Sequence, residues 1–203
     1  MAKEIIETLK KELAENPQSV FAHHRLGLAL WREGKINEAI EVLKKALEID
    51  PYAYDVRINL GTIYFQQGDL DAGIRETEQA LKIYPRSAEG WTNLGLAFFE
   101  QGRLEEAISA YRKALEVRPG MATTWVNLST ALIEKGEYQE AIEACNQALD
   151  FEPGFSVALN NLAVAYFYLE DYQEALKYLE KARELGYPVS EELVEEIKKR
   201  LSS

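Results

Sequence analysis

Residues 88–121 read AEGWTNLGLAFFEQGRLEEAISAYRKALEVRPGM, and this stretch decides the fold because the rest of the chain repeats its pattern. Apolar residues recur at helical spacing on both sides of Gly102, so the stretch predicts two helices joined by a tight turn. Glycine accepts the positive φ that such a turn needs, and the proline near the end stops the second helix. We therefore interpret residues 88–121 as one helix–turn–helix unit.

This unit is repeated along the chain. Turn glycines, leucines and alanines recur every 34 residues, and so do five prolines: Pro17, Pro51, Pro85, Pro119 and Pro153. A fixed period of this length is typical of units that stack into a solenoid rather than a closed globule. We expect five units, at residues 20–53, 54–87, 88–121, 122–155 and 156–189. Amphipathic segments at 1–16 and 190–203 are expected to be an N-terminal half-repeat helix and a C-terminal capping helix.

The pattern resembles the tetratricopeptide repeat, whose favoured residues are matched in the third unit by Trp91, Leu94, Gly95, Phe98, Ala107, Tyr111, Ala114 and Pro119. The resemblance implies an all-α fold, a right-handed superhelical solenoid of five such units. It also implies that Trp91 is buried between the helices of its unit. Matching columns in five tandem copies are specific for the fold, whereas one fold serves many functions.

Two units depart from the pattern. The second has Arg57 at the tryptophan position, with Gly73 and Thr77 in place of alanine and an aromatic residue, so we expect it to be the least stable. In the fifth unit, Glu170 stands at the turn glycine and the proline is displaced to Pro188.

Composition limits the classes of function. The 203 residues carry a net charge of −11, which disfavours binding to nucleic acid phosphates and to anionic membrane surfaces. The charged N-terminus lacks the apolar segment of a signal peptide, and no apolar run approaches the ~20 residues that span a bilayer. We expect one cooperative array in a cytoplasmic protein.

Catalytic groups are scarce. His23 and His24 are adjacent and point about 100° apart on a helix, so they do not form a metal-binding pair. The only cysteine, Cys145, falls in a core column and is expected to be a buried thiol. We predict no enzymatic activity, no metal and no cofactor.

The resemblance further implies that the first helix of each unit lines a concave groove. A column of asparagines falls on that face, Asn59, Asn93, Asn127 and Asn161, beside a row of large apolar groups that includes Phe65, Phe99 and Phe167. A carboxamide offers both a donor and an acceptor to a peptide backbone. We predict that these residues bind an extended peptide, and that Arg25 and Arg57 receive its acidic part.

The sequence thus predicts a protein–protein interaction module that binds a protein or peptide partner. The alternative is a structural protein that self-associates into a homo-oligomer through its terminal helices or outer face. The carboxylate clamp of chaperone-binding members of the family is matched at one position only, Asn59 when it is aligned from the first unit and again a single residue when it is aligned from the second, so we do not expect a cochaperone of that kind.

Overall fold

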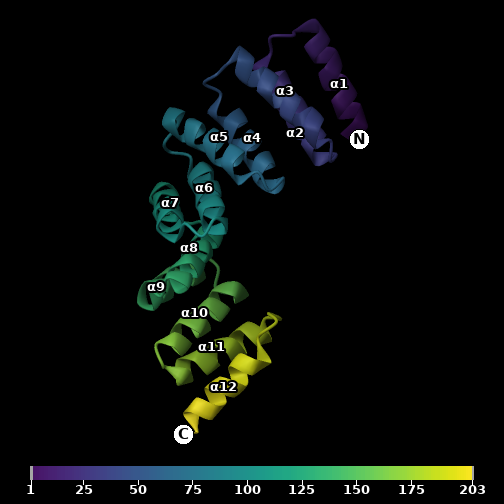
Figure 1. The fold of residues 1–203 in the computed structure, drawn as a ribbon. Coiled ribbons are helices and arrows are strands. Elements are labelled where there is room, and N and C mark those ends of the chain that lie inside the picture. Colours follow the sequence, from purple (N-terminus) through teal and green to yellow (C-terminus); the bar gives the residue numbers. More distant parts are fainter. Residues whose placement is uncertain (1, 203) are drawn as a thin grey trace. The chain divides into compact units, whose positions relative to one another are not determined.

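The computed structural model describes residues 2–202, and every regular element in that part of the chain is an α-helix (Figure 1). The all-α prediction is therefore confirmed. The helices are α1 (Ala2–Glu15), α2 (Val20–Arg32), α3 (Ile36–Ile49), α4 (Tyr54–Gln66), α5 (Leu70–Ile83), α6 (Ala88–Glu100), α7 (Leu104–Val117), α8 (Ala122–Lys135), α9 (Tyr138–Phe151), α10 (Ser156–Tyr168), α11 (Tyr172–Glu184) and α12 (Glu191–Leu201). Each expected 34-residue range contains two helices; Met1 and Ser203, the outermost residues of the predicted terminal helices, lie outside the described residues.

The chain divides by its internal contacts into two compact units, Met1–Ala97 and Phe98–Ser203. In the first unit, α2 packs against α3, α4 packs against α5, and α3 packs against α4. Helix α1 covers α2, and its Ile6 and Leu9 are buried with Leu26 and Leu30. The N-terminal helix thus completes the core of the first repeat.

The second unit follows the same packing. Helix α8 pairs with α9 and α10 pairs with α11, while α9 also contacts α10. Helix α12 lies against α11, where Val194 and Ile197 are buried with Leu179 (Figure 1). Ser190 accepts a hydrogen bond from the Leu193 amide and caps α12.

The turn inside each repeat uses a left-handed residue. The column glycines have φ between 72° and 85°, at Gly34, Gly68, Gly102 and Gly136. Glu170 adopts the same conformation with φ 62°, without the freedom of glycine. The fifth repeat therefore keeps the turn geometry at a cost in backbone strain.

The tryptophan column differs from the expectation. Trp91 is half-buried rather than enclosed, and its indole N–H donates to the Pro85 carbonyl at 2.8 Å. Trp125 makes the equivalent bond to Pro119 at 2.7 Å. The indole nitrogen reaches the loop before its own helix, and this bond holds the edge of the ring toward solvent.

The second repeat compensates for its departures from the pattern. A Cβ added to Gly73 would lie 2.3 Å from the Phe65 ring, so that ring occupies the space of the missing methyl group. The buried Thr77 hydroxyl donates to the Gly73 carbonyl at 2.8 Å, which satisfies it inside the core.

Cys145 is fully buried, as the sequence predicted. Burial raises the pKa of the Cys145 thiol to about 12, so the thiolate form is disfavoured at neutral pH. Cys145 is therefore a core residue of the fourth repeat.

Candidate functional site

The predicted asparagine column is tied into the protein by its own amide groups. In the first unit, Asn59 on α4 donates through Nδ2 to His24 Nε2 on α2 at 2.8 Å and to the Asp55 carbonyl at 3.0 Å. Asn93 on α6 donates through Nδ2 to Thr62 Oγ1 on α4 at 3.0 Å. The bonds to His24 and to Thr62 join the first helix of one repeat to the first helix of the repeat before it.

The second unit repeats this arrangement at Asn161. That side chain is only 8% exposed and donates from Nδ2 to Ser129 Oγ and Thr130 Oγ1, both at 3.0 Å. Asn127 is half-buried, and no hydrogen bond of its side chain is found among residues 2–202. Where both amide hydrogens are used internally, as in Asn59 and Asn161, the carboxamide oxygen is the atom left to accept from a ligand.

His24 orients Asn59. The imidazole lies between two partners, with Nδ1 3.2 Å from Asp55 Oδ2 and Nε2 beside the Asn59 amide. Since the amide donates to Nε2, Nδ1 carries the proton and donates to Asp55. Burial lowers the pKa of His24 below its ordinary value of 6.5, and the Asp55 carboxylate acts in the opposite direction.

The predicted aromatic row is half-buried at all three positions. Phe65 packs over Gly73 within its own repeat, and Phe167 lies edge-on to Tyr168 and Tyr172. Phe99 is likewise half-buried. These rings therefore contribute to packing and present only part of their surface to solvent.

The two predicted arginines lie in different surroundings. Arg25 is exposed, lies 5.3 Å from the centre of the Phe21 ring and 4.0 Å from a carboxylate oxygen of Glu12. Arg57 is half-buried, and its Nη1 lies 2.6 Å from Glu76 Oε2 on α5, while the guanidinium also donates to the Pro51 carbonyl. Its interactions are thus with its own repeat and with the last residues of the first repeat.

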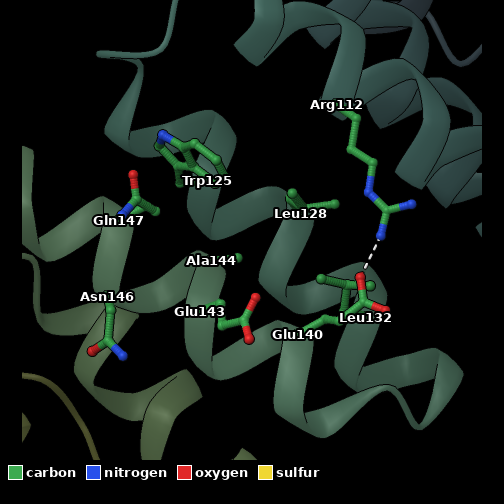
Figure 2. A pocket seen from close by; sticks show the side chains of 9 residues that line it. All are labelled: Arg112, Trp125, Leu128, Leu132, Glu140, Glu143, Ala144, Asn146 and Gln147. Atoms are coloured by element: carbon green, nitrogen blue, oxygen red, sulfur yellow. Dashed lines mark hydrogen bonds and ion pairs between the residues drawn. The ribbon is translucent and has the colours of Figure 1, made fainter.

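A pocket that the sequence analysis missed lies in the second unit (Figure 2). It has a volume of about 510 Å³ and lies between α7 and α9, over α8. We call it the α7–α9 pocket; its lining residues are Arg112, Trp125, Leu128, Leu132, Glu140, Glu143, Ala144, Asn146 and Gln147. At ~100° per residue, Trp125 and Leu128 lie about 160° and about 100° from Asn127 around α8, so the pocket and the asparagine column are on different faces.

The pocket combines an apolar floor with a charged rim. Trp125, Leu128 and Ala144 supply apolar surface, and Arg112 points toward Glu140, whose carboxylate lies 2.5 Å from its guanidinium (Figure 2). Glu143 also points into this region and has no ion-pair partner among the described residues. A signal was present in the sequence, since alanine and glutamine occur together at these two positions only in the fourth repeat, whereas each other repeat has a longer or charged side chain at one or both of them.

No group of three or more metal-ligating side chains that could hold an ion is found among residues 2–202. Within the same residues, no helix combines the length and apolar character needed to cross a bilayer.

Comparison with protein-family models gives four matches. Three models described as tetratricopeptide repeat match residues 58–122, 98–154 and 156–185, and a TPR repeat model matches residues 32–68. No curated protein sequence matches the chain.

Comparison with solved structures gives many similar chains. A crystal structure of MamA is 28% identical with a TM-score of 0.76, and the match covers 79% of this chain and 94% of MamA. YrrB, described as a TPR protein with an unusual peptide-binding site, is 22% identical with a TM-score of 0.81, over 96% of this chain and 99% of YrrB. PilF of Pseudomonas aeruginosa is also 22% identical, with a TM-score of 0.79 over 94% of this chain and 86% of that one. At this identity, YrrB and PilF show a shared fold.

Proposed function

Because the chain belongs to the tetratricopeptide-repeat family, we propose that it is a protein–protein interaction module that binds an extended segment of a partner protein along the asparagine column. Members of this family are typically interaction modules without enzymatic activity. The partner is a polypeptide, not a nucleic acid or a membrane, in line with the net charge of −11.

The observation that carries the proposal is the way the carboxamides are held. Internal hydrogen bonds occupy both amide hydrogens of Asn59 and of Asn161, and no described group donates to their Oδ1 atoms. These bonds hold one carboxamide oxygen in each unit in position to accept from a peptide backbone, that of Asn59 in the first and that of Asn161 in the second. We infer that Asn93 and Asn127, which lie in the same column, would add further acceptors. A partner main chain would donate its N–H groups to these oxygens.

The remaining predicted residues would set specificity. The exposed parts of Phe65, Phe99 and Phe167 would contact apolar side chains of the partner. Arg25, which is exposed, would attract a carboxylate of the partner protein near the first repeat. Arg57 would contribute only by releasing Glu76 and pairing with a carboxylate of the partner protein instead.

The test uses 12-residue peptides selected from an immobilised library for binding to the full chain. Asn127→Ala is the informative variant, because this side chain makes no internal hydrogen bond in the described structure and its loss should not disturb folding. One lost hydrogen bond of ~0.5–1.5 kcal/mol corresponds to roughly a 2- to 10-fold rise in Kd by fluorescence anisotropy. Asn37→Ala, on the exposed face of α3, is the matched control. Equal affinities for the two variants would remove the asparagine column from the binding site.

Self-association is the second candidate. Tyr168 and Leu169 at the end of α10 are 54% and 43% exposed, which gives the second unit an apolar surface next to the stacked Tyr138 ring. Sedimentation equilibrium at two protein concentrations separates the candidates. A dimer that is lost in Tyr168→Ser together with Leu169→Ser would favour this second function.

A further inference from the structure

The second and fourth repeats have different side chains at one equivalent location. Residues 68 positions apart are equivalent, so Trp125 corresponds to Arg57 and Ala144 corresponds to Glu76. In the second repeat, the Arg57 guanidinium lies at this location and binds Glu76 at 2.6 Å, with the two side chains 19% and 26% exposed. In the second repeat, this location is therefore occupied by a guanidinium from the first helix, α4, which pairs with a carboxylate from the second helix, α5.

The fifth repeat also supplies its own cation at this location. Lys181 on α11 lies 5.3 Å from the centre of the Tyr178 ring, and both line a hollow of about 380 Å³ together with Leu159, the residue equivalent to Trp125. Lys44 on α3 of the first repeat lies 5.8 Å from the Tyr64 ring on α4, and these two positions are equivalent to Arg112 and Leu132 of the α7–α9 pocket. Positive groups over aromatic rings thus recur along this side of the repeats.

In the fourth repeat the cation is missing while the site for it remains. The position of Lys181 is Gln147, and among residues 2–202 no cation lies over the Trp125 ring. The bond from the indole N–H to Pro119 fixes the orientation of that ring. Arg112 and Glu140 neutralise each other at one side of the α7–α9 pocket, so Glu143 is the carboxylate left for a ligand (Figure 2).

We propose that the α7–α9 pocket binds an arginine side chain of a partner protein, with the guanidinium between the Trp125 ring and the Glu143 carboxylate. The aliphatic part of the arginine contacts Leu128 and Ala144, which form the floor of the pocket. A planar guanidinium suits this site better than an ammonium, because it stacks on an aromatic face and pairs bidentately with a carboxylate. The pocket volume lies within the ~300–1,000 Å³ of typical ligand sites. This surface is separate from the asparagine column, so either proposal stands if the other fails.

The test is an NMR titration of ¹⁵N-labelled full-length protein with the probe peptide acetyl-Leu-Arg-Ala-amide at constant ionic strength. The indole N–H signals of Trp31, Trp91 and Trp125 are assigned with single Trp→Phe variants. We expect the arginine peptide to shift the Trp125 signal in a saturable manner and to leave the Trp31 signal unchanged. The same peptide with citrulline, which keeps the shape of arginine but has no charge, is expected to bind at least about fivefold more weakly.

Two matched variants decide the role of the carboxylate. Glu143→Gln is expected to raise the Kd of the arginine peptide about fivefold or more, whereas Glu41→Gln, at the equivalent exposed position of α3, leaves it unchanged. Equal binding of the arginine and citrulline peptides overturns the proposal, because the pocket would then read only apolar shape. No shift of the Trp125 signal up to saturating peptide overturns it as well.

Discussion

The second and fourth repeats each consist of an equivalent pair of helices, but they have different side chains at equivalent positions. At the tryptophan position, repeat two has an arginine held by Glu76, and repeat four has Trp125 beside a pocket. Repeat two places the Phe65 ring over Gly73, whereas repeat four has a buried alanine, Ala141, at the same position. The comparison shows that the helix pair tolerates the loss of a favoured residue at one position when a neighbouring side chain occupies the space. Where no side chain occupies the space, a pocket is left at the surface.

The largest expected effect concerns the two ion pairs. Arg57→Ala leaves the half-buried Glu76 without its partner, so we expect a loss of about 2–3 kcal/mol, below the ~3–5 kcal/mol for a fully buried pair. Arg112→Ala breaks a pair whose side chains are 50% and 53% exposed, and we expect ~0–1 kcal/mol. Urea denaturation measures both.

Transplanting residues sharpens this comparison. The double variant Arg57→Trp with Glu76→Ala gives repeat two the residues of repeat four and should recover most of the stability that Arg57→Ala loses. If Arg57→Ala and Arg112→Ala cost the same, burial of the pair is not what distinguishes the repeats.

The next effect concerns the glycine in repeat two. Gly73→Ala places a methyl group 2.3 Å from the Phe65 ring, so the ring must tilt. Overpacking of this kind costs ~1–3 kcal/mol, and we expect about 1–2 kcal/mol because Phe65 is half-buried. The reverse change in repeat four, Ala141→Gly, should also destabilise by about 1–2 kcal/mol through lost helix propensity and lost burial.

A second-site variant tests the cause. Phe65→Leu should reduce the cost of Gly73→Ala, because the smaller side chain leaves room for the methyl group. Additive losses in the double variant would mean that the ring and the glycine are not coupled. A Gly73→Ala variant as stable as the wild type would show that the second repeat has room to spare.

The sequence predicted the repeated elements well because their determinants are local. Turn glycines, N-caps such as Ser190 and the helical spacing of apolar residues act within a few residues, so they can be read along the chain. The bonds that hold Asn59 and Asn161 connect residues 31 to 35 positions apart, and they depend on how first helices pack side by side. The α7–α9 pocket was missed for a related reason: it results from small or uncharged residues at several columns, and no single column reports it.

Substitutions at the left-handed turn residues should change the free energy of unfolding by a smaller amount, with a sign set by the backbone conformation. Glu170→Gly in repeat five removes a left-handed cost of ~1–2 kcal/mol and adds ~0.5–1 kcal/mol of glycine entropy, so we expect a gain of about 0.5–1 kcal/mol. Gly68→Ala at the matching turn of repeat two should lose about 1 kcal/mol, since its φ of 77° is unfavourable for alanine. Thermal unfolding followed by circular dichroism measures both. A destabilised Glu170→Gly variant would mean that the glutamate side chain contributes more than its backbone strain costs.

The smallest effect distinguishes the asparagines of the two repeats. Asn59 in repeat two donates to His24, whereas Asn127 in repeat four has no such partner among the described residues. Burial lowers the pKa of His24 below 6.5 in the folded protein, so the unfolded chain binds this proton more readily. The contribution to stability is therefore complete above pH 6.5, declines as the pH falls toward the folded pKa, and stays constant below it.

A protonated His24 carries a hydrogen on Nε2 and no longer accepts from Asn59, so the carboxamide must turn and its oxygen no longer keeps its position. Urea midpoints of the wild type and of His24→Gln between about pH 7.5 and pH 5 measure the effect, and the wild type should lose more stability over this range. Identical pH dependence of the two proteins would show that the imidazole does not couple protonation to the fold, and that Asn59 and Asn127 are held equally well without it.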